Sequence, residues 1–199
     1  MLLLSTTYFG PVQWYQKLNR YDHVLIEHHE HFQKQTYRNR CLIATAQGVQ
    51  ALTVPVSGDE ALISDHGNWR HVHWQALQSA YGDSPFFEFY EDDVRPFFED
   101  RRWRTLYEFN MDICLTMCRL LDIHPHIQPT TTYIIPSGED KRGGLLDLRS
   151  SIRPKHPAED PDFQPQPYYQ VFREKHGFLP NLSILDLLFN MGPEAIFYL

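Results

Sequence analysis

The segment 8–40 constrains the fold more than any other part of this chain. An apolar run over residues 2–6 predicts a strand, a Gly10-Pro11 turn leads into a predicted helix over 11–20, and residues 24–26 predict a second strand. A short β-branched run is typical of a strand covered on both faces, so we expect the two strands to be parallel. The polar cluster 28–40 then follows the second strand, where open α/β sheets bind their ligands. The pattern therefore predicts a βα unit that leads into a binding site.

The rest of the chain continues to alternate between strand and helix patterns. Residues 41–46 and 49–56 flank Gln47-Gly48 and predict a β-hairpin, at which the central sheet is expected to become mixed. Because 199 residues with 42% apolar content suit one core, we expect a single α/β domain, with a mainly parallel central sheet flanked by helices and an inserted β-hairpin. The further expected elements are helices over 70–81, 94–98 and 103–121, an aromatic connection over 86–90, a buried strand over 130–135, and a long loop over 137–162.

The C-terminal part predicts one more buried helix. Ser183 and Asp186 have the spacing of a capping box, in which both side chains satisfy free amides at a helix start. Leu185, Leu188 and Phe189 are expected to dock into the core, and Gly192-Pro193 ends the helix.

Composition excludes several classes of partner. The formal net charge is -7, with 18 Lys and Arg against 25 Asp and Glu, so no basic field favours nucleic acid. No segment has the roughly 20 apolar residues that a membrane span needs, and the first residues do not have the pattern of a secretory leader. Three cysteines are an odd number and are best explained as buried thiols. These features predict a cytoplasmic location, and they leave the oligomeric state open.

Two groups of residues suggest an anion site. Arg38 and Arg40 flank Asn39, so in an extended segment both guanidinium groups project to one side and could hold a phosphate or carboxylate, with Lys34 nearby. Surface ion pairing is the alternative. Asn68 and Arg70 stand where a loop enters a helix, a place where free amides favour a negative group. Asn68 could equally be only a helix cap.

The same helix start offers a candidate base. His71 is expected to share a face with Trp74, so its imidazole could act as a general base, whereas His73 is expected at the surface or in a structural role. Val72, Leu77 and Ala80 are expected to face the core. The prediction for this chain is one cleft that joins Arg38, Arg40, Arg70 and His71 around a small anionic ligand.

Other chemistries lack a supporting pattern. His28, His29 and His31 cluster without the spacing of a zinc site, so no metal site is predicted. The sequence has no Gly-x-Ser-x-Gly elbow, Walker loop or dinucleotide fingerprint, so the cofactor remains unknown. Tyr8 and Trp74 could offer flat faces to a sugar or base, although most aromatic residues belong to the core.

Several blocks together resemble the WbqC-like protein family. These are Tyr8-Phe9-Gly10-Pro11 with Gln13 and Trp14-Tyr15, Arg38-Asn39-Arg40, Asn68-Trp69-Arg70-His71 through Tyr81, and residues 179–190. The resemblance implies a bacterial protein associated with O-antigen and other surface-polysaccharide gene clusters. A transferase that moves an acyl, aminoacyl or related group to a nucleotide-linked amino sugar would suit that context, with Tyr8 and Gln13 among its ligand-binding residues. The strand, turn and helix opening is also remotely similar to nucleotidyltransferases with a phosphate-binding helix start, but the His-x-Gly-His signature is missing.

The chain departs from the family pattern at two places, and three functions stay open. Ser5-Thr6-Thr7 stands where many relatives have Gln-Pro, and residues 136–140 match only the Ser-Gly part of a Ser-Gly-Pro segment. The first function is a transferase that binds a nucleotide sugar or an acyl donor. The second is a non-catalytic module that binds an anionic metabolite, and the third is a structural partner in a biosynthetic complex. A cleft with both cations and a base would favour the first.

Overall fold

A parallel four-stranded sheet organises the protein, of which the computed structural model describes residues 1–135 and 144–199. Its strands are β1 (Leu2–Leu4), β2 (His23–Ile26), β7 (His126–Pro129) and β8 (Leu146–Asp147), in the order β7-β2-β1-β8. Leu2 pairs with Val24 and with Leu146, and His23 pairs with His126, all in parallel register. The α/β prediction and the parallel pairing of the first two strands are therefore confirmed.

The third predicted strand was misplaced along the chain. We expected it over 130–135, but the pairing ends at Pro129, opposite Ile26, and residues 130–135 form no strand. Thr130 instead turns its hydroxyl to the buried carboxylate of Glu27, at 2.7 Å. A side chain that completes a polar network at the end of the strand outweighed the β-propensity of this segment. The predicted long loop contains one short strand, β8. Its residues 137–143 lie outside the described ranges.

The predicted hairpin forms, but it does not join the central sheet. β3 (Arg40–Thr45) and β4 (Gly48–Thr53) pair in antiparallel register as a separate two-stranded sheet, with Gly48 at φ 109° in the turn. β3 packs against the helices α2 and α7 through its buried side chains, and this packing keeps the hairpin away from β1. A further short hairpin, β5 (Val56–Ser57) with β6 (Leu62–Ile63), was not predicted.

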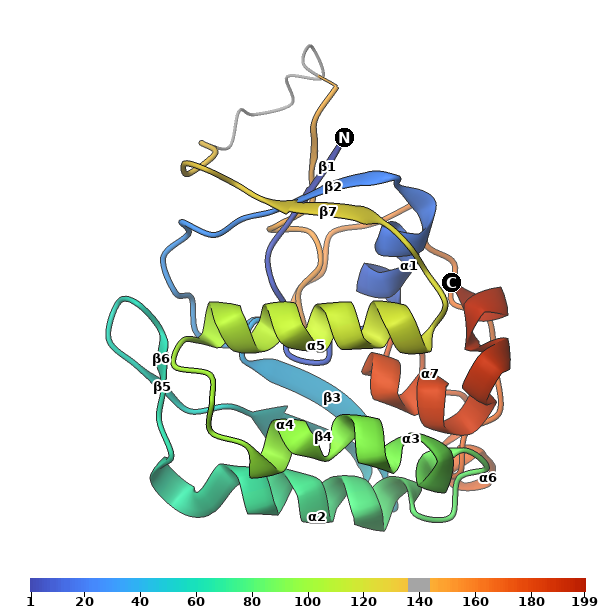
Figure 1. Cartoon of the computed structure of the whole chain (residues 1–199). Helices are drawn as coiled ribbons and strands as arrows, with labels where there is room; N and C mark the ends of the chain where they lie inside the picture. The colour runs from blue at the N-terminus through green and yellow to red at the C-terminus, as the bar shows by residue number, and fades with distance from the viewer. Residues whose placement is uncertain (136–143) are drawn as a thin grey trace.

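Helices cover the rest of the core, as Figure 1 shows. The sheet lies at the top of that view, α5 crosses the middle, and α2, α3 and α4 lie below it with the β3–β4 hairpin. Thr105 and Glu108 form a capping box at the start of α5. The aromatic connection expected over 86–90 belongs mostly to a helix, α3. The helices are α1 (Val12–Arg20), η1 (His66–Asn68), α2 (Trp69–Tyr81), α3 (Phe87–Val94), α4 (Pro96–Glu99), α5 (Leu106–Leu120), α6 (Arg173–His176), α7 (Ile184–Met191) and η3 (Gly192–Tyr198).

The last α-helix, α7, is buried along almost its whole length. Leu185, Leu188 and Phe189 are fully buried, as predicted, and Ser183 caps the helix by accepting from the amide of Leu185. The predicted capping role of Asp186 is wrong. Its carboxylate points inward and accepts hydrogen bonds from the hydroxyls of Tyr81 and Tyr168 and from the amide of Gln170.

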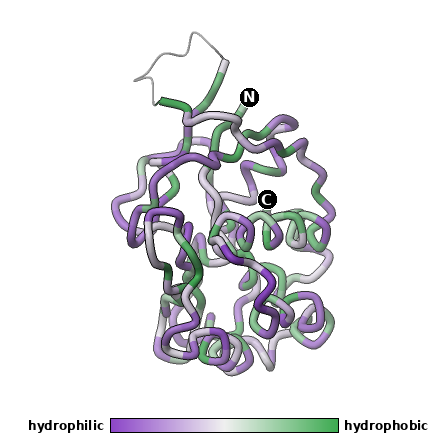
Figure 2. The backbone as a smooth tube through the Cα atoms, turned by 60° about the vertical axis from the view of Figure 1, so that its left-hand side comes forward, coloured by the Kyte–Doolittle hydropathy of each residue, from purple (hydrophilic) through white to green (hydrophobic). Residues whose placement is uncertain are grey.

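Apolar and polar stretches alternate along most of the backbone (Figure 2). No helix within the described ranges is both long and apolar enough to cross a bilayer.

Candidate anion-binding pocket

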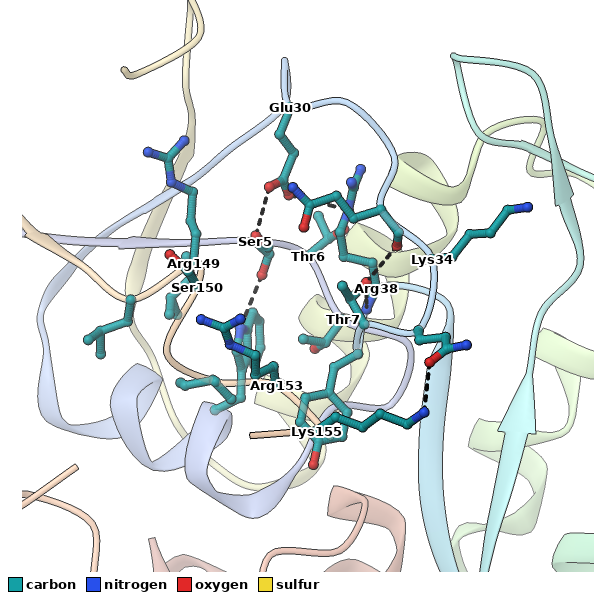
Figure 3. Close-up of a pocket in the computed structure, with 18 of the residues that line it drawn as sticks. Ser5, Thr6, Thr7, Glu30, Lys34, Arg38, Arg149, Ser150, Arg153 and Lys155 are labelled. Carbon is teal, nitrogen blue, oxygen red and sulfur yellow. Dashed lines mark hydrogen bonds and ion pairs between the residues drawn. The ribbon is translucent and has the colours of Figure 1, made fainter. Parts of the chain in front are cut away.

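A cavity of about 320 Å³ opens where the strands β1 and β8 end (Figure 3). Its lining comes from residues 4–7 after β1, residues 30–38 after β2, and residues 148–156 after β8, with Trp14 of α1. The chain runs from β1 outward to β2 and β7 on one side and then returns to place β8 on the other side of β1. Ligands of open α/β sheets bind at such a reversal of strand order, outside the carboxyl ends of the strands.

The charge of this pocket is opposite to that of the whole chain. Five of the 18 Lys and Arg residues line it, and among the described lining residues Glu30 is the one carboxylate. A concave site that gathers cations in a net-acidic protein focuses a positive potential and attracts anions. The five cations are Lys34, Arg38, Arg149, Arg153 and Lys155.

Two of these cations already pair with carboxylates of the protein. Arg149 donates to Glu27 at 2.9 Å, to both oxygens of Asp147, and to the carbonyl of Ile134. Glu27 is fully buried; burial alone would raise its pKa, but hydrogen bonds from the amides of Ile134 and His29, from Thr130 and from Arg149 together lower it. Arg149 and Glu27 therefore tie the ends of β2 and β8 together, and this pair holds the pocket walls in place.

Arg38 is the second cation that pairs with a carboxylate. Its Nη1 donates to the carbonyl of His31 at 2.8 Å, and its Nε lies 3.3 Å from Glu30. Burial lowers the pKa of Arg38, although Glu30 and Glu27 act in the opposite direction. The guanidinium is largely enclosed between Glu30 and Phe32, whose ring centre lies 5.7 Å from it.

The other three cations stand at the rim. Lys34, Arg153 and Lys155 are exposed, and Lys155 donates to the side chain of Gln35 at 2.9 Å. Within residues 1–135 and 144–199, Arg153 has no hydrogen bond or ion pair through its side chain. These side chains keep donors available for a ligand, whereas Arg38 and Arg149 shape the wall.

Buried polar atoms in the wall also lack partners. Thr7 Oγ1, Glu30 Oε1 and Arg38 Nε have no hydrogen bond to any described residue. A buried polar group without a partner is costly, so such groups call for an explanation. Gly10 lets Thr7 occupy this position, because a Cβ on Gly10 would lie 2.3 Å from Thr7 Oγ1.

Glu30 stands out among the lining residues. The hydroxyl of Ser5 donates to its Oε2 at 2.9 Å. Burial raises the pKa of Glu30, and neither the neighbouring Arg38 and Arg149 nor the hydrogen bond from Ser5 fully offsets this effect. The pocket thus holds a carboxylate whose negative charge is incompletely compensated.

An ion pair and a hydrogen bond hold the segment that carries Arg153 and Lys155 against α1. Lys17 of α1, fully buried, lies 2.8 Å from Oδ2 of Asp160, and Gln13 donates to the same carboxylate. Burial alone would raise the pKa of Asp160, but the hydrogen bonds from Lys17 and Gln13 lower it. Gln13, expected to bind ligand, therefore positions the far end of this wall.

The predicted single cleft is wrong. Arg38 and Lys34 line the pocket described above, whereas His71 lines a second cavity of about 150 Å³ with Asn68, Arg70 and Trp74. Arg40 lines neither of these two cavities, and its Nε donates to Thr53 Oγ1 across the hairpin. Arg38 and Arg40 alternate along the backbone, but the hairpin begins at Arg40 and takes its side chain to a different partner.

The buried face of α2 also differs from the prediction. Of the two roles open for His73, the structure shows the structural one: it is buried and its Nδ1 lies 2.8 Å from the Tyr8 hydroxyl. His71 is exposed, and Val72, expected to face the core, is half exposed. The core stripe runs through Trp69, His73 and Leu77 at a spacing of four, and this signal was available in the sequence. Burial lowers the pKa of His73 to about 4, so the imidazole is neutral near pH 7.

The remaining predicted ligand residues take part in the packing of the core. Tyr8 is fully buried, Asn39 donates to the carbonyl of Val54, and Arg70 donates to the carbonyl of Phe97. The guanidinium of Arg70 also lies 4.5 Å from the ring centre of Trp69, which is the geometry of a cation–π contact.

The start of α1 is closed to a ligand. The amide of Val12 donates to the carbonyl of Leu182, and the amide of Gln13 donates to the side chain of Asn181. Since these amides are already bonded, the phosphate site suggested by the remote likeness to nucleotidyltransferases does not form at this helix.

Metal binding finds no support in the described part of the chain. Residues 1–135 and 144–199 hold no group of three His, Cys, Asp or Glu side chains placed to bind a metal ion. His28 instead stacks on Tyr107, with ring centres 4.0 Å apart.

Sequence reasoning missed the cations after β8. Arg149, Arg153 and Lys155 follow a two-residue strand in a stretch rich in Pro and charge, which we assigned to loop. The signal was their position directly after a strand of the sheet, the same criterion that singled out residues 28–40.

The fold and the pocket together define an α/β protein with a basic binding site at the carboxyl edge of a parallel sheet. A model of the WbqC-like protein family matches residues 6–156, and the chain belongs to that family. The match covers the pocket lining from Thr6 onward and ends before α7. An uncharacterized protein of Mycobacterium tuberculosis, Rv1507c, is 28% identical over 205 residues, with 89% of this chain and 87% of that protein covered. No solved structure matches the chain.

Proposed function

We propose that this protein is a transferase of bacterial surface-polysaccharide biosynthesis that binds the phosphate groups of a nucleotide-linked amino sugar in its basic pocket. The observation that carries the proposal is the gathering of five cations where β1 and β8 end, in a chain with a net charge of -7. The cavity of about 320 Å³ lies within the size range of small-molecule sites. The polysaccharide context and the transferred acyl, aminoacyl or related group come from the resemblance to the family. A nucleotide-linked substrate places the protein in the cytoplasm.

Within this proposal, the exposed rim cations Arg153, Lys155 and Lys34 bind phosphate. Arg38 and Arg149 act mainly through the wall, because their donors are committed to Glu30, Glu27 and Asp147. We also propose that the second cavity, which is lined by Asn68, Arg70, His71 and Trp74, binds a second substrate with His71 as candidate base.

Calorimetric titration with UDP-glucosamine, whose amine is free, and with UDP tests the proposal. A charge-assisted hydrogen bond contributes about 1.5–3 kcal/mol, so Arg153→Gln should raise the Kd about tenfold or more. Arg104→Gln is the matched control, because Arg104 is exposed and lies outside the pocket, and it should leave the Kd unchanged. Absence of binding by the wild-type protein, or equal effects of the two substitutions, would contradict the proposed site.

Catalysis needs a separate measurement. Incubation of the protein with the nucleotide sugar and acyl or aminoacyl donors should give a product whose mass is increased by the transferred group. Binding without any such product would favour the alternative function, a non-catalytic module for an anionic metabolite.

A further inference from the structure

The pocket has two chemically different ends. Figure 3 shows Arg153 and Lys155 on one side of Ser5 and Glu30 on the opposite side in that view. All four residues line the same cavity. A ligand that fills the cavity would therefore meet Arg153 and Lys155 at one end and the Glu30 carboxylate, with Arg38 beside it, at the other.

The carboxylate of Glu30 has unused capacity to accept hydrogen bonds. Ser5 supplies a single hydrogen bond to Oε2, at 2.9 Å, and Oε1 has no hydrogen bond to any residue of the described ranges. Arg38 Nε is 3.3 Å from Oε1, an ion pair without hydrogen-bond geometry. An ionised carboxylate offers about four acceptor positions, and the hydrogen bond from Ser5 and the contact with Arg38 do not fill them.

The electrostatics around Glu30 favour a cationic donor. Ser5 of the segment after β1, Arg38 of its own segment, and Arg149 and Glu27 at the ends of β8 and β2 act on this carboxylate. Together they leave its pKa raised, because desolvation outweighs the two arginines. A protonated amine placed against it would supply the missing compensation, since opposite charges stabilise the ionised form.

Resting on the proposed function, we infer that the ligand of this pocket is a phosphorylated compound that also carries a free, protonated amine, and that Glu30 binds this amine. Arg153 and Lys155 bind the phosphate end, and Ser5 orients the Glu30 carboxylate. Glu30 is thereby a specificity residue that distinguishes an amino sugar from its hydroxyl or N-acetyl counterpart. A site built to pair with a donor group discriminates strongly against analogues that lack it.

The test compares three probes that differ at one position: glucosamine 6-phosphate, glucose 6-phosphate and N-acetylglucosamine 6-phosphate, titrated calorimetrically at pH 7. Wild-type protein should bind the free amine about tenfold more tightly than the other two. Glu30→Gln should reduce this preference to within about threefold, while the affinity for glucose 6-phosphate changes little. Glu60→Gln, at an exposed position outside the pocket, is the matched control and should retain the preference.

The outcomes separate this inference from the proposed function. Arg153→Gln should weaken all three probes alike, because it acts on the phosphate. Equal binding of the three probes by the wild-type protein, or a preference that survives Glu30→Gln, overturns the role of Glu30 and leaves the anion site standing. Absence of binding for all three probes overturns this inference, and absence of binding for UDP and UDP-glucosamine as well overturns the proposed function. Ser5→Ala gives a second reading if Glu30→Gln fails to fold, since it should reduce the preference without removing the carboxylate.

Discussion

Asp186 provides a sharp test of how this core is held together. Its carboxylate is fully buried on α7 and accepts from Tyr81 at 3.0 Å, Tyr168 at 2.7 Å and Gln170 at 2.8 Å. The three donors come from α2 and from the segment before α6, so one side chain joins three parts of the chain. Asp186→Ala would leave these donors buried without their acceptor.

The expected loss follows from the count of these donors. Each of the three buried donors that loses its acceptor costs about 1–3 kcal/mol. Removal of the buried carboxylate charge offsets part of this total cost. We expect Asp186→Ala to lower the free energy of unfolding by about 4 kcal/mol. Asp186→Asn should cost only about 1 kcal/mol, because its amide oxygen can still accept and its amide nitrogen can donate to the Tyr81 hydroxyl.

The pH dependence of the free energy of unfolding gives a second test. Burial raises the pKa of Asp186, and the hydrogen bonds from Tyr168, Gln170 and Tyr81 only partly oppose this effect. The native state therefore holds the proton more tightly than the unfolded state, whose aspartate pKa is about 3.9, and the contribution of Asp186 falls as pH rises above that value. The advantage of the wild-type protein over Asp186→Asn should therefore shrink as pH rises above about 4.

Urea denaturation followed by circular dichroism measures these differences, with Asp92→Ala as an exposed control expected to lie within about 0.5 kcal/mol of wild type. Equal losses for Asp186→Ala and Asp186→Asn would refute the reasoning. So would a loss below about 1 kcal/mol for the alanine variant, because it would mean that water or rearranged partners satisfy the three donors.

Two further predictions concern α7 and α2. Leu188→Ala should cost about 2–5 kcal/mol in urea denaturation, and Ser183→Ala about 1–3 kcal/mol, because Ser183 both caps α7 and donates to the carbonyl of Phe9 at 2.7 Å. The reverse order would show that α7 is less deeply packed than its burial indicates. For His73, a pKa lowered to about 4 means that stability is present above the unfolded value of about 6.5 and is lost as pH falls toward 4. His73→Gln should remove this loss, and parallel pH profiles for both proteins would argue against a neutral, buried imidazole.

Local patterns were enough to predict the framework of this fold. The apolar runs of β1 and β2, the Gly10-Pro11 turn and the hairpin around Gly48 all depend on neighbouring residues, and the structure confirms them. The buried face of α7 follows in the same way from its apolar residues. In each case a short stretch of sequence holds all of the information that the element needs.

The pocket could be anticipated only in part. Placing ligands after parallel strands directed attention to residues 28–40, of which Lys34 and Arg38 do line the cavity. The opposite wall of the cavity comes from the segment after β8, and it faces Lys34 and Arg38 because β8 pairs with the far side of β1. A two-residue strand gives too weak a signal to predict that pairing. Arg153 and Lys155 were therefore missed.

The sequence by itself determined most of the elements that form and that cationic side chains follow the strands. Only the tertiary structure decided which of those side chains meet: it separated Arg38 from His71 by placing them in different cavities, buried His73 against Tyr8, and turned Asp186 from a cap into the acceptor of three buried donors. The physical reason is that secondary structure depends on residues a few positions apart, whereas a site depends on pairings between residues more than a hundred positions apart, such as Glu27 with Arg149 and Lys17 with Asp160.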